Sequence, residues 1–297
     1  LVPAVATSGT LPTSLVGSSV AMSLARPMDF RFIRYTRYGE HQQAALRTFY
    51  NGALPVHAAG TTTLASLDAL DAKIAKDANG NPLPYVPETE AGKEYPADWY
   101  AAGFKESLQC VAQLIKMDVG LQVASVDFGG WDTHQDQSYI FARLVDGMSR
   151  TLAAFYNDLR NYHSRLTVVV ISEFGRRLRA NGSGGTDHGH GGMMLAMGGS
   201  VKGGRMYGSW PGLNVEQLDN RVDLKVTTDF RTILSEVVAR RLANPKLGQI
   251  FPGITPEIYS TTNRLDFLNG ADLPIDYTSP ITNPNPNRAV YLPFVSK

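Results

Sequence analysis

The chain has 297 residues, 43% of them hydrophobic and 19% charged, and its formal net charge is +1. This composition is typical of a globular protein with a sizeable core and excludes a disordered chain. The small net charge gives no reason to expect nucleic acid or an anionic membrane surface as a partner. No apolar run reaches the roughly 20 residues of a membrane span. Cys110 is the only cysteine, which excludes an internal disulfide, and we expect a buried, inert thiol.

The N-terminal part of the chain predicts little regular structure at first. Residues 1–27 are rich in Ser, Thr, Gly and Pro and predict an irregular arm. From 40 to 76, apolar residues recur at helical spacing. The stretch "DANGNPLPYVPETEAGKEYPADW" follows, and its Asn-Gly pair and repeated prolines predict a loop.

The middle of the chain predicts alternating helices and strands. Residues 98–117 and 138–162 have the apolar spacing of helices, and residues 120–128 fit a strand. Residues 166–172, "LTVVVIS", form a β-branched run typical of a strand buried on both faces. A third strand begins at Met193. Strand, helix and strand in this order predict a parallel sheet with a right-handed crossover, and hence an α/β sandwich.

The C-terminal part closes that domain and continues as a tail. Residues 227–242 predict a helix with Thr227 or Thr228 as N-cap and Asp229 in its first turn, where the helix dipole favours an anion. The tail is rich in Pro and Asn and predicts an extended linker that ends in one apolar, strand-like patch. We expect this patch to dock on a neighbour or on the domain's own edge.

Two glycine-rich loops directly follow the predicted strands 120–128 and 166–172. Since ligands bind at the carboxyl ends of strands in open α/β sheets, these loops are well placed for a site. Carboxylates mixed with imidazoles suit zinc, manganese or iron, as one ion or as a two-metal centre. The candidate ligands are Asp132, His134, Glu173, Asp187, His188 and His190.

The same residues allow a reading without a metal. Asp132 can cap the helix that begins near Gln137, and "GSGGTDHGHGG" can be a solvated surface loop that carries the glycosylation sequon Asn181-Gly182-Ser183. Arg176 and Arg177 are candidates for holding an anionic substrate, and a solvated loop is the alternative for them. The residue pattern alone leaves the metal site and the capped turn equally open.

The order of the motifs resembles a known family. "VDFGGWDTHQDQ", "VVVISEFGRRLRANGSGGTDHGHGGMMLAMGGSVKGGRMYG" and "TTDFRTILSEVV" are similar in order and spacing to the bacterial family called domain of unknown function 1501. The resemblance covers roughly residues 98–250, with weaker similarity in the helical stretch before it. That family is grouped with the alkaline phosphatase and sulfatase superfamily of metal-dependent phosphate and sulfate ester hydrolases. The resemblance therefore implies an alkaline phosphatase-like, three-layer α/β sandwich around a mainly parallel sheet.

The resemblance also implies roles for the loop residues. Asp132 and His134 resemble the superfamily's Asp and His ligands, although the superfamily separates the two more widely. In one alignment Glu173 and Phe174 stand at the place of a later Asp-His pair. In the other, Asp187 and His188 fill it and His190 completes the first metal. Both alignments stay open, with one or two divalent ions such as zinc or manganese as the implied cofactor.

One departure from the superfamily concerns its nucleophile. The superfamily draws a Ser or Thr nucleophile and one metal-binding Asp from its first strand, and nothing in residues 1–97 resembles that strand. We therefore expect this chain to be the C-terminal portion of a larger fold without its N-terminal strands. The N-terminal part would be a separate, cleaved or missing segment. In this division 1–97 belong to the same fold, 98–252 form the metallohydrolase-like core, and 253–297 form the tail.

Two functions follow as expectations. The first is a metal-dependent phosphate or sulfate ester hydrolase-like domain whose nucleophile lies upstream, with Arg176 and Arg177 near the anion. The alternative is a non-catalytic surface or assembly protein, a homo-oligomer or coat subunit, that retains the fold and docks its tail on a partner. Phe174 at a ligand-like position and the short Asp-x-His spacing favour the alternative. The resemblance and the processed-looking start imply a secreted, periplasmic or cell-surface protein.

Overall fold

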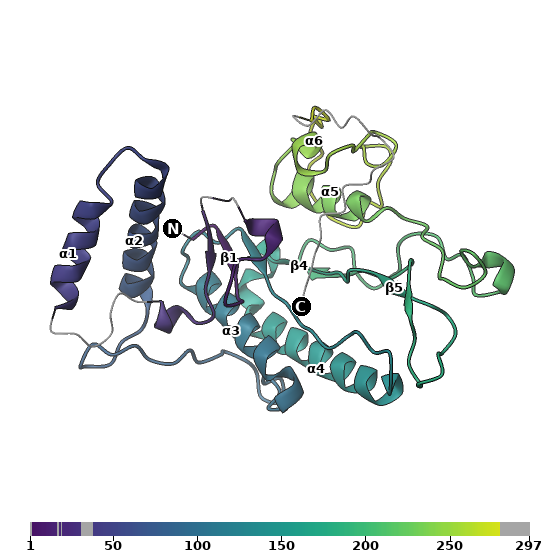
Figure 1. Ribbon diagram of the computed structural model, residues 1–297, viewed down its shortest axis with the longest axis horizontal. Helices are drawn as coiled ribbons and strands as arrows, with labels where there is room; N and C mark the ends of the chain where they lie inside the picture. The colour runs from purple at the N-terminus through teal and green to yellow at the C-terminus, as the bar shows by residue number, and fades with distance from the viewer. Residues whose placement is uncertain (1, 17, 19, 31–37, 280–297) are drawn as a thin grey trace. The chain divides into compact units, whose positions relative to one another are not determined.

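The computed structural model describes residues 2–16, 18, 20–30 and 38–279. The chain divides into two compact units, whose main elements are labelled in Figure 1. Among the described residues, the first comprises those up to Gly130 and Arg143–Leu159, and the second comprises Trp131–Ala142 and residues 160–279. The strand-like patch predicted near the C-terminus lies outside the described residues. The predicted domain boundary after residue 97 falls inside the first unit.

The first unit contains a small parallel sheet, where the sequence predicted an irregular arm. Strand β1 (Ala4–Ala6) lies between β2 (Ala21–Ser23) and β3 (Val123–Ser125) and runs parallel to both. Each strand has three residues, too few to show an alternating pattern, and β1 meets β3 across more than a hundred residues of chain. The prediction for residues 1–27 was therefore wrong in its strands. Two short 3-10 turns, η1 (Thr13–Leu15) and η2 (Pro27–Asp29), complete this region.

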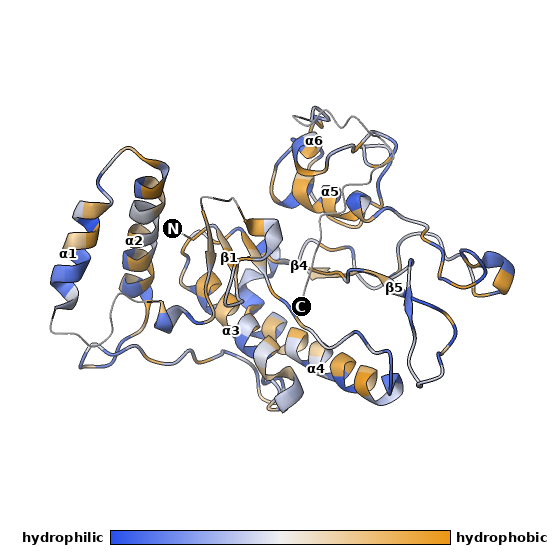
Figure 2. Cartoon of the chain, in the orientation of Figure 1, coloured by the Kyte–Doolittle hydropathy of each residue, from blue (hydrophilic) through white to orange (hydrophobic). Residues whose placement is uncertain are grey.

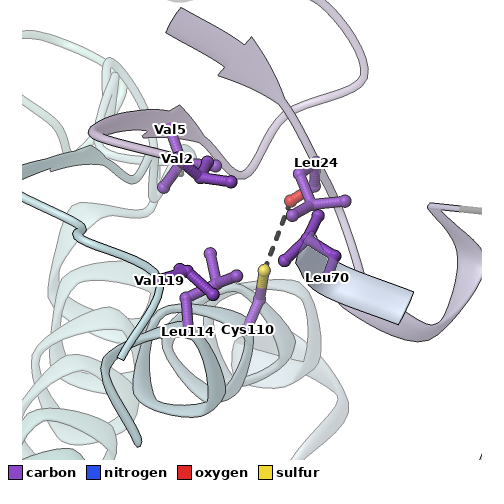
Figure 3. Close-up of a cluster of buried hydrophobic side chains, with 7 residues drawn as sticks. All are labelled: Val2, Val5, Leu24, Leu70, Cys110, Leu114 and Val119. Atoms are coloured by element: carbon purple, nitrogen blue, oxygen red, sulfur yellow. Dashed lines mark hydrogen bonds between the residues drawn. The ribbon is translucent and has the colours of Figure 1, made fainter. Parts of the chain in front are cut away.

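A buried apolar cluster joins this sheet to the helices of the same unit. Figure 3 shows Val5 of β1 and the preceding Val2 facing the helix that carries Cys110 and Leu114, and the Sγ atom of Cys110 donating to the backbone oxygen of Leu24, 3.3 Å away. Burying side chains of this kind contributes roughly 1.5–3 kcal/mol each, so the cluster stabilises the sheet. Its members are Val2, Val5, Leu24, Leu70, Cys110, Leu114 and Val119.

The helices of the first unit agree with the sequence pattern. The predicted helical region 40–76 forms α1 (Gly39–Phe49) and α2 (Pro55–Lys73). The break falls before Pro55, which suits the first turn of a helix because that position needs no backbone N–H. The predicted helix at 98–117 is confirmed as α3 (Ala102–Lys116), preceded by the 3-10 turn η3 (Trp99–Ala101). Long helix α4 (Gln137–Asp158) confirms the predicted helix at 138–162.

Asp158, at the end of α4, anchors the proline-rich loop of the first unit. Its side chain is fully buried and accepts hydrogen bonds from Tyr85 Oη at 2.7 Å, the Glu88 backbone N–H at 2.7 Å and Tyr95 Oη at 3.2 Å. Lys116 Nζ lies 2.7 Å from it and supplies the opposite charge. Burial next to this carboxylate raises the pKa of both tyrosines. A loop without regular structure is thus fixed by one satisfied ionic group.

The second unit contains two antiparallel strand pairs. Strand β4 (Thr167–Val170) pairs with β7 (Leu195–Gly198), and β5 (Gly175–Arg176) pairs with β6 (His188–Gly189). The run at 166–172 is therefore a strand, as predicted. Its pairing is antiparallel, and its side chains are only half-buried rather than covered on both faces. The protein is a mixed α/β structure whose parallel sheet has three short strands in the first unit.

The remaining elements close the second unit. They are η4 (Arg160–Arg165), η5 (Val215–Gln217), α5 (Phe230–Arg241) and α6 (Leu247–Ile250). Asp229, and not Thr227 or Thr228, is the N-cap of α5, because its side chain accepts a hydrogen bond from the Arg231 backbone N–H at 2.8 Å. The buried Glu236 of α5 accepts from the backbone N–H groups of Asp266 and Leu268, which holds the following segment in place.

The described helices carry both hydrophobic and hydrophilic residues, as Figure 2 shows for α3 and α4. Among the described residues, none of the helices has the length and apolar content that crossing a membrane requires.

Candidate metal centre

Three side chains of the second unit converge at one point. The Nε2 atoms of His134 and His188 lie 3.0 Å apart. The Oδ1 atom of Asp132 lies 3.1 Å from the first nitrogen and 2.8 Å from the second. All three side chains are partly open to solvent, with exposed fractions of 63% for Asp132, 44% for His134 and 49% for His188. This is the one group of His, Cys, Asp and Glu side chains among the described residues that presents three donor atoms close enough for a single ion.

Close backbone packing brings the two ligand loops together. Thr186 N donates to Thr133 O at 3.3 Å, and Gln135 and Gly184 form an isolated β-bridge. Gly185 packs directly on His134, so that a Cβ at residue 185 would overlap the carbonyl carbon and oxygen of His134. The pairing of β5 with β6 places His188 opposite Arg176. Gly185, Gly189 and Gly191 of "GSGGTDHGHGG" are therefore needed for close backbone approach, whereas Gly182 has open space around it.

Arg176 ties the loops together from a position close to the ligands. Its guanidinium donates to the backbone oxygens of Trp131 and Thr186 and to Oδ1 of Asp132, each at 2.8 Å. It also lies 5.3 Å from the centre of the Phe174 ring. These contacts use most of the donors of a side chain predicted to hold an anionic substrate.

The other predicted ligands lie outside the group of three. Asp187 contacts the other ring nitrogen of His134, with its Oδ1 atom 3.3 Å from Nδ1. His190 Nδ1 lies 2.7 Å from Asp219 Oδ2. Glu173 is not part of the group. Arg177, the second predicted substrate contact, has its Nε atom 3.7 Å from Asp223 Oδ1.

One residue of the site was not among the predicted ligands. Asn181 begins the sequon Asn181-Gly182-Ser183, and its side chain donates to both ligand loops, at His134 O and at Asp187 Oδ1. The sequence contains a signal for it, because Asn followed by Gly and Ser favours a turn in which the Asn side chain bonds to nearby backbone. That signal does not say which distant loop the amide reaches.

The electrostatics of the site favour ionised carboxylates. The hydrogen bond from His188, followed by that from Arg176, holds the pKa of Asp132 below its ordinary value. The pKa of Asp187 is lowered mainly by Asn181 and then by His134. Asp219 raises the pKa of His190 through their hydrogen bond. Asp132 is therefore a ready anionic ligand at neutral pH.

The donor set fits a divalent transition metal. Ligand atoms about 2.0–2.1 Å from a tetrahedral zinc ion lie about 3.3 Å from one another, slightly more than the separations of 2.8–3.1 Å between these three donors. A small outward rotation of the side chains would suffice, and their exposure permits it. Two imidazoles and one carboxylate also match the donor types that zinc, manganese and iron accept.

Comparison with known proteins adds the family. The family model described as "Protein of unknown function (DUF1501)" matches residues 38–250. This confirms the resemblance seen in the motifs and extends it through the helical region before them. No curated protein and no solved structure matches the chain. Because the match covers well over half of its length, the chain belongs to the DUF1501 family of proteins of unknown function.

Proposed function

We propose that the second unit binds a divalent transition-metal ion, such as zinc or manganese, through Asp132, His134 and His188. The observation that carries this proposal is the convergence of two imidazole nitrogens and one carboxylate oxygen within 3.1 Å of one another. Three protein ligands with an open position are typical of catalytic zinc sites, whereas structural sites are closed by four. The exposure of the three side chains supports an open position.

The chemistry that we propose is hydrolysis of a phosphate or sulfate ester, as in the alkaline phosphatase and sulfatase superfamily that the sequence resembles. When bound, the ion would supply Lewis-acid chemistry at a phosphoryl or sulfuryl oxygen. Asp132 contributes the anionic donor, and Arg176 orients its carboxylate through their 2.8 Å hydrogen bond. We assign the nucleophile to no residue of this chain.

We further propose an alkaline phosphatase-like sandwich as the complete fold. Two features support it. The first unit has a parallel sheet. In the second unit, β4 is a β-branched run of the kind that is normally covered on both faces, yet its side chains remain half-exposed. The helix layers of a complete sandwich would cover them.

A specific observation favours the alternative of a protein that retains the fold without the reaction. Both arginines predicted to hold an anionic substrate are paired inside the unit, Arg176 with Asp132 and Arg177 with Asp223. In addition, Phe174, which stands at a ligand-like position in one alignment, stacks its ring on His188 with ring centres 3.8 Å apart. In this alternative the ion would stabilise an extracellular surface or assembly protein, with the C-terminal tail docked on a partner.

The metal content of the purified full chain, measured by elemental mass spectrometry, tests the binding proposal. We expect about one equivalent of zinc, manganese or iron in the wild type and none in the double variant Asp132→Ala His188→Ala. The matched control is Glu40→Ala His41→Ala on α1, an acid and a histidine in the other unit. A metal content that is equally low in all three proteins would refute the site.

An assay of the metal-loaded chain with p-nitrophenyl phosphate and p-nitrophenyl sulfate then separates the two functions. Release of nitrophenol that disappears in the Asp132→Ala His188→Ala variant supports the hydrolase. Full metal occupancy with no release above the variant's background favours the non-catalytic alternative.

A further inference from the structure

The two histidines of the metal centre are held in place in different ways. His188 stacks on the Phe174 ring, with ring centres 3.8 Å apart and planes inclined by 24°. His134 instead presents its second ring nitrogen, Nδ1, to the carboxylate of Asp187 at 3.3 Å. Metal-binding histidines usually donate this second N–H to a carboxylate or carbonyl, which fixes the tautomer and the ring orientation. Asp187 thus occupies the position of the carboxylate that orients a metal-binding histidine.

Asn181 in turn holds Asp187. Its Nδ2 atom donates to Asp187 Oδ1 at 3.1 Å and to the backbone oxygen of His134 at 2.8 Å. Its Oδ1 atom accepts from the backbone N–H groups of Ser183 at 2.9 Å and Gly185 at 3.1 Å. A primary amide offers two donors and one acceptor oxygen, so both hydrogens and the oxygen are used.

We propose that Asn181 is a positioning residue of the metal centre, which sets the orientation of His134 through Asp187 and through the His134 backbone. This inference rests on the proposed metal-binding function. The side-chain amide is required because its NH2 group faces two oxygens while its carbonyl faces two N–H groups. An aspartate has the same size, and it would replace the two donors by an oxygen that faces a carboxylate and a carbonyl. The change Asn181→Asp therefore alters the polarity of the contact and leaves its volume nearly unchanged.

The first test measures the zinc affinity of the full chain by competition with a chromophoric chelator. We expect Asn181→Asp to weaken zinc binding by about 10- to 100-fold, the usual effect of losing a partner of a metal ligand. The matched control is Asn79→Asp, at another Asn-Gly pair, in an exposed turn of the first unit where the bond to Asp77 uses the backbone N–H. An affinity of Asn181→Asp within twofold of the wild type would overturn the proposal.

A second variant tests whether the three residues act in sequence. Asp187→Asn removes the charge that orients His134 and keeps the size of the side chain, so it also serves if Asn181→Asp does not fold. Because Asn181 acts through Asp187, the loss of zinc affinity in the double variant Asn181→Asp Asp187→Asn should be well below the product of the two single-variant losses. Losses that multiply fully would show two independent effects and would contradict the sequential arrangement.

A third measurement does not depend on metal binding. In the metal-free chain labelled with 15N, imidazole NMR reports which ring nitrogen of His134 carries the proton. We expect the Nδ1–H form in the wild type and in Asn79→Asp, and an increased Nε2–H form in Asn181→Asp. If the wild type binds no zinc, the proposed function fails, and this tautomer still decides the role of Asn181. An unchanged tautomer in Asn181→Asp would refute that role.

Discussion

The Nε2 atoms of His134 and His188 lie 3.0 Å apart, although 54 residues separate the two histidines in the chain. Two imidazole nitrogens at this distance need a proton or a cation between them, because two lone pairs that face each other repel. Asp132 adds a negative charge next to both. The arrangement therefore suits a proton or a metal cation between the two rings, and it depends on close contact between two loops.

That loop contact predicts opposite outcomes for two glycines of the same loop. A side chain at residue 185 would overlap the His134 carbonyl, whereas one at residue 182 would meet nothing within 4 Å. We expect Gly185→Ala to push the ligand loops apart, to cost about 1–3 kcal/mol of stability and to weaken zinc binding at least about tenfold. Gly182→Ala should stay within about 0.5 kcal/mol of the wild type. Chelator competition and urea unfolding measure both, and equal effects at the two positions would contradict the packing.

The buried ion pair of the first unit predicts a large effect of removing one partner. Asp158→Ala leaves Lys116, which is 15% exposed, without its buried carboxylate, and such changes cost about 3–5 kcal/mol. We expect a clear fall in the midpoint of urea unfolding, followed by far-UV circular dichroism. As a control, Lys93→Ala breaks the exposed pair with Glu90 and should cost less than about 1 kcal/mol. A small effect of Asp158→Ala would show that Glu88, whose Oε1 atom lies 3.3 Å from Lys116 Nζ, or water replaces the lost carboxylate.

The start of α5 offers a test between sequence and structure. Since the Asp229 side chain caps the helix, Asp229→Ala should cost about 0.5–2 kcal/mol. Thr228, a predicted cap, makes no such hydrogen bond, so Thr228→Ala should change stability by less than about 0.5 kcal/mol. Urea unfolding of the two variants side by side measures the difference. The reverse order of effects would move the start of the helix to Thr228.

Burial raises the pKa of the Cys110 thiol from its ordinary value of 9.0 to about 12. The unfolded chain therefore loses this proton at a lower pH than the folded chain does. The stabilising contribution is fully present below about pH 9 and is lost as the pH rises toward about 12. We expect the stability of the wild type to fall over this window more steeply than that of Cys110→Ala.

Alkylation provides the matching kinetic measurement for Cys110. At pH 8, iodoacetamide should modify the native protein only at the rate of unfolding, because the thiol is buried and protonated. The same reagent should modify the chain rapidly in urea. Fast labelling of the native protein would mean that the cluster shown in Figure 3 opens locally.

Much of the local structure could be read from the sequence. The apolar spacing at 98–117 and 138–162 identified α3 and α4, because a long amphipathic pattern has few alternatives to a helix. The β-branched run at 166–172 identified β4 in the same way. The two glycine-rich loops were also recognised as the place where acids and histidines gather.

The strand pairing could not be read in this way. Strands β1 and β2 have three residues each and are stabilised by contacts with distant parts of the chain. The antiparallel pairing of β4 with β7 depends on how the chain turns between them. A local pattern contains neither kind of information, because it reports which residues are buried and not which residues meet.

The candidate site shows the same division. By itself, the sequence determined the residue types and the two loops, and it left a metal site and a capped turn equally open. Only the tertiary structure decided that Asp132, His134 and His188 meet, that Asp187 lies behind His134, and that His190 pairs with Asp219. It also showed that Asn181 joins the loops. The physical reason is that a metal centre depends on side-chain directions to within about an ångström, and these are set by packing between segments some fifty residues apart.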